Sequence, residues 1–226
     1  YEMLSGDWSS DVCSSDLAMA ISDNGWPLNR RLALFDTDCL EVADENSMRS
    51  AQLPDFGIRP RVQPLAEKLD SLYAFAKRHD LVMVFTQCCS ARAVAPGSHP
   101  EVLVVPMDPE DRGWMDRVGR FRLINIQKHS AAPLHQSFIC RHFDMFQHNG
   151  NARRLLEILD IPRWIVFGHG LDLCVDSAVK GIVAAGYAAH VLTDVLASSA
   201  TGYGPYGTPE SGRSILEYLM KIGVTT

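Results

Sequence analysis

Residues 164–195 read WIVFGHGLDLCVDSAVKGIVAAGYAAHVLTDV, and this stretch decides the fold. A short apolar run (164–167) is followed by a glycine-containing turn and by a helical pattern that ends near Gly186. A second apolar run (189–193) then leads to Asp194. A strand, a helix and a second strand in this order form the repeating unit of a parallel α/β sheet.

The rest of the chain continues this alternation. Three further β-rich runs are continuous in their apolar character, which is typical of strands covered on both faces, and they span 31–35, 81–85 and 122–127. A fourth run, 101–105, is expected to be a short or irregular edge strand. Helical spacing of apolar residues predicts helices over 65–76, from 144 or 151 to 160, and over 209–221.

Polar or small residues follow the strands directly, and parallel strands bring them to one rim of the sheet. Open α/β sheets bind their ligands outside the carboxyl ends of the strands. A carboxylate, an amine and a thiol that are far apart in sequence are thereby expected within reach of one another. The residues predicted at this rim are Asp36, Thr86, Lys128, Gly168 and Asp194.

Cys174 is the candidate nucleophile. Asp172 is a good N-cap residue, which would leave Cys174 in the first turn of a helix. The unpaired amides and the helix dipole favour the thiolate there, although Asp176 opposes this effect. A base and a cation are therefore needed nearby. The alternative is that Cys174 is a buried cysteine that packs as a small hydrophobic side chain.

Asp36 and Lys128 are the candidates for the base and the cation. A carboxylate at the end of a continuous apolar run is costly unless it has a partner, and Asp36 stands at such a place. It could instead cap the next segment or pair with a lysine, and Asp38 is a weaker candidate for the base. Lys128 closes its run in the same way, and its alternative is a solvated lysine at a strand end.

Composition limits the class of protein. A chain of 226 residues that is 46% hydrophobic is expected to form one domain. A formal net charge of −6, without any basic run, argues against nucleic acid or a membrane surface as the partner. No apolar stretch is long enough for a transmembrane helix. Residues 1–17 differ in character from the rest, and we expect 1–27 to be an N-terminal extension that is disordered or foreign to the domain 28–226.

Six cysteines without CxxC pairs or regular spacing indicate reduced thiols, and hence a cytoplasmic protein. Cys88 and Cys89 could bind zinc together with His99, but neither their spacing nor a fourth ligand supports a zinc site.

The quoted stretch, together with RLALFDTD (31–38) and FICRHFDMF (138–146), resembles the isochorismatase-like cysteine hydrolase superfamily. This superfamily includes nicotinamidases, carbamoylsarcosine and ureidoacrylate amidohydrolases, and isochorismatases. The resemblance covers roughly 28–226. It implies a three-layer α/β/α fold whose mostly parallel central sheet has about six strands, and a catalytic set of Asp, Lys and Cys.

Carried over by position, the resemblance makes Asp36 the general base, Lys128 the activating cation and Cys174 the nucleophile. Arg141 is the substitute cation, because some relatives place their lysine near the position that Cys140 occupies here. The resemblance also implies a cis peptide between His169 and Gly170 and an oxyanion hole formed by the amides of Gly170 and Cys174. Further candidates for the pocket wall are Thr86, Gln87, Arg141, Phe143 and Phe146, although the two phenylalanines could equally belong to the core.

The resemblance predicts a hydrolase that cleaves an amide-type C–N bond of a small molecule through a thioester. Nicotinamidases carry Asp-x-His after the second strand for a metal, whereas this chain has Thr86, Gln87 and Cys88 there. We therefore expect neither metal nor cofactor. The alternatives are a catalytically altered ligand-binding or regulatory protein of the same fold and an isochorismatase-type vinyl ether hydrolase. Relatives suggest a homo-oligomer, either a dimer or a tetramer.

Overall fold

The computed structural model describes residues 27–39, 66–87, 100–127, 144–197 and 209–226. Strands in these segments form one sheet in which all neighbouring pairs are parallel, in the order β3-β4-β2-β1-β5-β6. The strands are β1 (Leu32–Thr37), β2 (Val82–Gln87), β3 (Val102–Val105), β4 (Leu123–Gln127), β5 (Arg163–His169) and β6 (Ala188–Ala197). The parallel sheet expected from the sequence is therefore confirmed.

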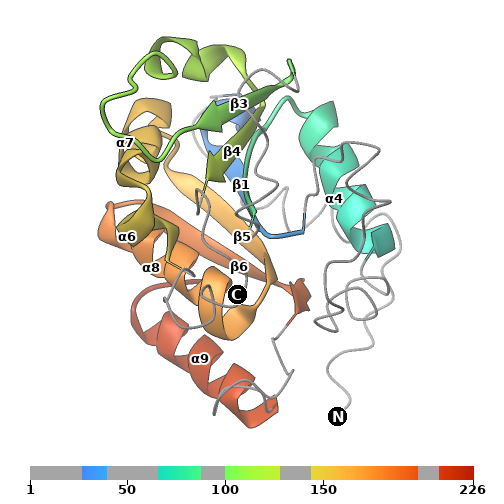
Figure 1. The fold of residues 1–226 in the computed structure, drawn as a ribbon. Helices are drawn as coiled ribbons and strands as arrows, with labels where there is room; N and C mark the ends of the chain where they lie inside the picture. Colours follow the sequence, from blue (N-terminus) through green and yellow to red (C-terminus); the bar gives the residue numbers. More distant parts are fainter. Residues whose placement is uncertain (1–26, 40–65, 88–99, 128–143, 198–208) are drawn as a thin grey trace, which may run out of the picture.

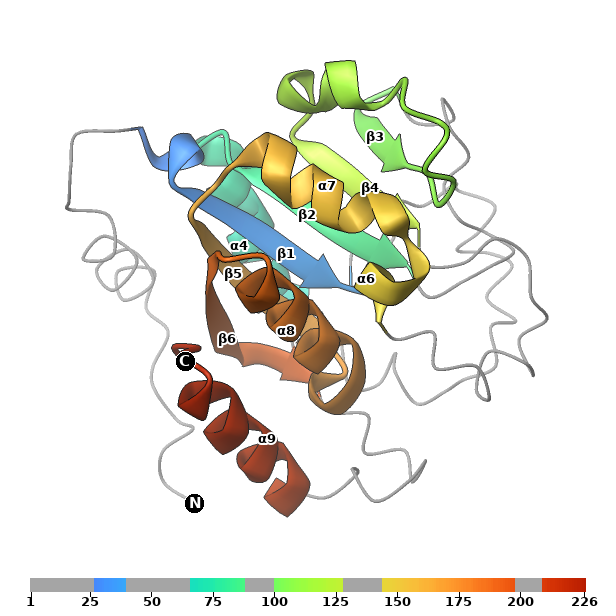
Figure 2. The same cartoon turned by 90° about the vertical axis from the view of Figure 1, so that its left-hand side faces the viewer.

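Helices cover both faces of this sheet. Helix α4 lies on one side, and α7 and α8 lie on the other (Figure 1). Figure 2 shows α7 and α8 in front of the strands, with α9 beside them. The helices are α4 (Ala66–Arg78), α6 (Met145–His148), α7 (Gly150–Leu159), α8 (Asp176–Ala184) and α9 (Pro209–Lys221), with shorter helical segments η1 (Leu28–Arg30), η3 (Met115–Arg120) and η4 (Leu171–Val175).

Two apolar cores lie on the two faces of the sheet, and the alternation of side chains along β1 divides its residues between them. Leu32 and Leu34 belong to the core that α4 covers, whereas Ala33 and Phe35 belong to the larger core under α7, α8 and α9. All six residues of β1 are buried. This double burial explains why the strand lacks the alternation of polar and apolar residues seen in half-exposed strands.

The segment 144–160 forms two helices, and the second of them agrees with the expected helix that starts near 151. Helix α6 ends at His148, and α7 starts at Gly150 after Asn149, which has an extended backbone. The Asn149 side chain caps α7 by accepting a hydrogen bond from the amide of Asn151. The start near 144 does not hold, because the Asn149 side chain caps a new helix at this position.

Strand β6 is longer than expected, so Asp194 does not follow the strand. The pairing of β5 with β6 shifts between Val166, which faces Val191, and Gly168, which faces Leu196. Asp194 lies within this irregularity, and the strand pairs in register again at Leu196 and Ala197. The apolar pattern could not show the continuation because an irregular pairing does not preserve the alternation of faces.

The end of the chain adds to the same edge of the sheet. Thr225 forms a parallel bridge with His190, and backbone hydrogen bonds join Thr225 to Ala189 and Val191. Helix α9 agrees with the expected range 209–221. Among the helices that the structure describes, none combines the length and the apolar character needed to cross a membrane.

Candidate active site

The carboxyl ends of β1 and β5 meet at the rim where the sequence predicts the site. Asp36 pairs in register with Phe167, and Thr37 pairs with Gly168. Both Asp36 and Thr37 belong to β1 itself and are fully buried. The strand therefore holds the candidate base rigidly, because its backbone is part of the hydrogen-bonded sheet.

Gly168 allows the two strands to approach closely at this rim. Its φ is +119°, a conformation that side chains rarely permit. A Cβ at this position would lie 2.3 Å from the carbonyl oxygen of Thr37 and 2.6 Å from its hydroxyl oxygen. The Thr37 hydroxyl in turn donates a hydrogen bond to the carbonyl oxygen of Phe167 at 2.9 Å. Only a glycine fits the space between β1 and β5.

Both carboxylate oxygens of Asp36 accept hydrogen bonds. The backbone amide of Cys39 donates to Oδ1 at 2.9 Å, and the Tyr73 hydroxyl donates to Oδ2 at 2.6 Å. Tyr73 lies on α4, on the face of the sheet that Leu32 and Leu34 share. Donors that point at a carboxylate favour its ionised form and compensate for its burial. The structure therefore provides the partners that a buried Asp36 requires.

A second contact joins the ends of β1 and β2. The Thr86 hydroxyl donates to Oδ1 of Asp38 at 2.9 Å. Asp38 has a φ of +66°, a left-handed conformation that aspartate tolerates better than most residues. Thr86 is fully buried, and its hydroxyl is used in this bond, so its first role is to fix the backbone after Asp36.

Cys174 lies in η4, a single π-helical turn between β5 and α8. The N-cap of this turn is Gly170, without a side-chain hydrogen bond, so the expectation that Asp172 caps the helix is wrong. The Gly170 carbonyl instead accepts the amides of Leu173 and Val175, at 3.0 and 3.1 Å. Such wide turns occur often at functional sites.

The side chain of Cys174 is 3% exposed, and both Cys174 and Cys39 are free thiols. Asp176, expected to oppose the thiolate, pairs with Lys180 at 2.6 Å. This ion pair offsets the negative charge in the turn after Cys174.

Asparagine side chains fix the neighbouring end of β4. The Asn149 amide donates to the carbonyl of Val105, at the end of β3, and to that of Gln127, at the end of β4. Lys128 directly follows Gln127, but Lys128, Arg141 and Phe143 lie outside the described residues, so their roles stay predictions.

Phe146 packs against α8. A Cβ on Gly181 would lie 2.0 Å from its ring, which places the ring directly on the helix backbone. Phe146 also packs on the larger core, which agrees with the alternative that this phenylalanine belongs to the core and not to the pocket wall.

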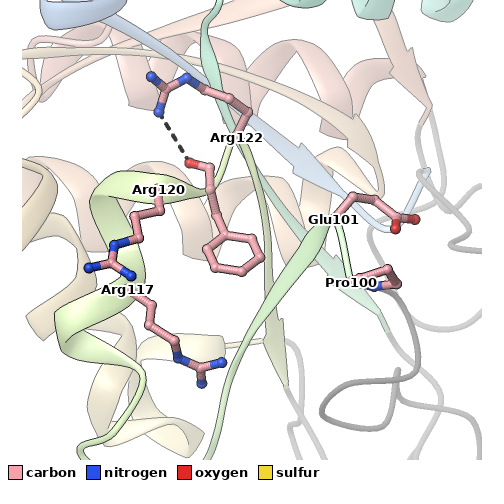
Figure 3. A pocket seen from close by; sticks show the side chains of 6 residues that line it. Pro100, Glu101, Arg117, Arg120 and Arg122 are labelled. Carbon is pink, nitrogen blue, oxygen red and sulfur yellow. Dashed lines mark hydrogen bonds between the residues drawn. The ribbon is translucent and has the colours of Figure 1, made fainter.

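A cavity of about 510 Å³ is lined by residues that precede β3 and β4 (Figure 3). It therefore lies at the amino ends of the strands, opposite the rim that carries Asp36. It is lined by Pro100, Glu101, Arg117, Arg120, Phe121 and Arg122. Arg122 pairs with Asp80 through two hydrogen bonds of 2.7 and 2.8 Å. None of the nucleophile or base candidates lines this cavity.

Within the described segments, His, Cys, Asp and Glu residues form no group of three or more that could hold a metal ion. Cys88, Cys89 and His99 lie outside these segments. Thr86 begins the stretch in which nicotinamidases carry their metal ligands, and its hydroxyl bonds Asp38. Thr86 and Gln87, the described residues of this stretch, are not among the Cys, His and carboxylate ligands that zinc prefers.

Comparison with known proteins supports the fold. The pyrazinamidase of Pyrococcus horikoshii, solved in complex with zinc, is similar with a TM-score of 0.52 and 14% identity, over 86% of this chain and 97% of that chain. The nicotinamidase of Staphylococcus aureus is similar with a TM-score of 0.52 and 12% identity, over 87% of this chain and 99% of that chain.

The sequence matches no family model and no curated protein. At such low identity the structural likeness establishes the fold alone. The protein therefore shares its three-layer α/β fold with these two solved structures, and this is the fold that the sequence resemblance implied.

Sequence reasoning missed Tyr73 and Asn149. The helical spacing places Tyr73 inside the expected helix 65–76, and it places Asn149 either inside or just before the next expected helix. Such spacing shows which face is apolar but not which polar group reaches a strand end. The only available signal for Asn149 was its position before a glycine and an apolar helical run, which is typical of an N-cap.

Proposed function

We propose that this chain is a cysteine-dependent hydrolase that cleaves an amide-type C–N bond in a small molecule. Cys174 is the nucleophile and Asp36 the general base. One observation carries the proposal: a fully buried carboxylate at the end of β1 and a nearly buried thiol in the turn after β5 belong to neighbouring strands, which pair at Thr37 and Gly168. A carboxylate that stays buried at a strand end, close in the fold to a thiol, is a candidate acceptor for the proton of that thiol. Their burial also favours small substrates.

The reaction begins when Asp36 accepts the proton of Cys174 as the sulfur attacks the carbonyl carbon. The new C–S bond places negative charge on the carbonyl oxygen. The C–N bond then breaks, and the leaving nitrogen takes the proton from Asp36. Water attacks the resulting thioester with the same carboxylate as base, and the C–S bond breaks to release the acid and the free thiol.

The amides of Gly170 and Cys174 are the proposed donors to the developing oxyanion. The Gly170 carbonyl accepts two backbone amides that lie on either side of Cys174, and these bonds fix the conformation of the turn. Fixed donors stabilise a developing charge without the cost of reorganisation. Loss of one such donor in other enzymes lowers the rate by about a hundredfold or more.

Lys128 is the proposed cation, with Arg141 as its substitute. The strand order places β4 two strands from β1 and three from β5. Neighbouring strands lie about 4.8 Å apart, so the end of β4 is roughly 10 Å from β1 and 14 Å from β5. A lysine starting from β4 is therefore expected to reach Asp36 more easily than Cys174, and to stabilise the charged form of the acid–thiol pair from the Asp36 side.

The test compares two cysteine variants at the same rim. Wild type, Cys174→Ala and Cys39→Ala are incubated with a panel of small amides, and released amine and adduct mass are measured. Cys39→Ala retains the backbone amide that bonds Asp36, so it is expected to keep turnover and the acyl adduct. Cys174→Ala is expected to lose both. Turnover that persists in Cys174→Ala would exclude a thiol mechanism.

Labelling with a thiol reagent separates this proposal from a ligand-binding protein that has lost the chemistry. A catalytic Cys174 is modified much faster than an ordinary thiol such as glutathione near neutral pH. Equal rates would favour the binding protein. A cytoplasmic location stays a prediction, and so does a dimer or tetramer. Size-exclusion chromatography with light scattering can check the oligomeric state.

A further inference from the structure

Tyr73 contacts the candidate base from the opposite layer of the protein. It lies on α4, which covers one face of the sheet, whereas η4 with Cys174 leads into α8 on the other face (Figure 1). Its hydroxyl reaches Oδ2 of Asp36 at 2.6 Å, a short distance for a neutral donor and typical of a bond to a charged oxygen. The general chemistry proposed above does not use this group.

The Tyr73 hydroxyl and the backbone amide of Cys39 divide the carboxylate between them, with one oxygen each. The hydrogen bond from the Cys39 amide holds Oδ1 of Asp36 close to the backbone three residues further along the chain. The phenol fixes the other oxygen from outside β1, so the plane of the carboxylate is set by both contacts. Of these two donors, only the phenol can be removed by substitution without altering the backbone.

We propose that Tyr73 is a positioning residue that orients Asp36, keeps it ionised in acid and makes its protonated form a better proton donor. The proposal rests on the proposed function, in which Asp36 first accepts the thiol proton and later gives it to the leaving nitrogen. A hydrogen bond to the carboxylate stabilises the charged form more than the neutral one. It therefore weakens the base slightly in the first step and strengthens the acid in the second.

This role has a signature in the pH dependence of Cys174 reactivity. When Asp36 is protonated, the thiol has lost its acceptor, so reactivity falls on the acid side of a pH profile. The midpoint of this acid limb belongs to the coupled pair of Asp36 and Cys174. Removing the phenol favours the protonated carboxyl and moves the midpoint to higher pH. The plateau does not fall, because the carboxylate has become the stronger proton acceptor.

Tyr73→Phe is the appropriate variant, since it removes one oxygen atom and keeps the ring. The ring of Tyr73 lies 6.4 Å from that of Phe167, centroid to centroid, and this contact survives the substitution. Tyr187→Phe is the matched control. Tyr187 follows α8 and immediately precedes β6, so it lies at the opposite end of the sheet from Asp36.

The experiment measures the rate at which 2,2′-dithiodipyridine, a reagent that reacts with thiols in acid, modifies Cys174 in the full chain. The modified peptide is quantified by mass spectrometry over the pH range in which circular dichroism shows an intact fold. In Tyr73→Phe the acid midpoint is expected to rise by about one to two pH units, the size of one lost hydrogen bond to a charged group. In Tyr187→Phe it is expected to stay at the wild-type value.

The result that would overturn the proposal is a Tyr73→Phe midpoint equal to that of wild type, with or without a lower plateau, since a merely structural role moves only the plateau. Failure of the proposed function would look different. In that case Cys174 of the wild type would react no faster than glutathione at any pH, before any variant is compared.

Discussion

Gly168→Ala tests the close approach of β1 and β5 on which the candidate site depends. The added Cβ would meet the Thr37 carbonyl oxygen at 2.3 Å, whereas ordinary contact begins at 3.4 Å. The strands must therefore separate by roughly an ångström at the rim, which costs about 1–3 kcal/mol as overpacking. The φ of +119° adds strain of about 1–3 kcal/mol for a residue with a side chain. We expect a total loss of about 2–6 kcal/mol of unfolding free energy.

Two other glycines separate the contributions in urea unfolding experiments. Gly186 has a φ of +92° and open space where a Cβ would lie, so the stability lost in Gly186→Ala should come from backbone strain alone. Gly119→Ala has open space and no positive φ, and its stability should be unchanged or slightly higher. Gly168→Ala should also slow the modification of Cys174. If Gly168→Ala were no less stable than Gly186→Ala, the reasoning from the contact with Thr37 would be refuted.

Three further predictions concern other parts of the fold. Asn149→Ala removes a helix cap and the donor to two strand carbonyls, so urea unfolding should show a loss of about 2–4 kcal/mol; a cost as small as that of exposed Gln147→Ala would contradict the contacts. Burial lowers the pKa of His190 from 6.5, so the folded chain binds this proton less readily than the unfolded chain, and stability should fall as pH drops below 6.5. His190→Gln should weaken this pH dependence, and an unchanged slope would exclude His190 as its source. The Arg122 guanidinium lowers the pKa of Asp80, but the pair is exposed, so Asp80→Asn should cost less than about 1 kcal/mol in the same assay; a loss above about 2 kcal/mol would contradict this surface assignment.

Those elements whose residues are buried on both faces or on one helical face could be predicted from the sequence. The apolar run before Asp36 and the helical spacing in α9 each state directly which side chains avoid water. Parallel topology follows from the alternation of strands and helices, so the rim and its candidate residues also follow. Asp36 could be singled out because its carboxylate directly follows a continuous run of apolar residues.

The partners of Asp36 could not be predicted, because they depend on packing between layers. Tyr73 is separated from Asp36 by 37 positions, and its bond exists only because α4 packs on β1. Similarly, Asp172 is a good cap by type, but the chain forms a π-turn around the Gly170 carbonyl. Local propensity does not decide between these two turns, since β5 and α8 fix where the turn must begin and end.

The most direct test of the central claim is the rate at which a small thiol reagent modifies Cys174 at neutral pH. This rate is compared with that of glutathione and with the rates of the other cysteines in the intact chain. A thiol that shares its proton with Asp36 at the joined ends of β1 and β5 should react at least about tenfold faster than glutathione, and selectively. Slow modification at the glutathione rate or below, without preference for Cys174, would contradict an activated nucleophile at this rim.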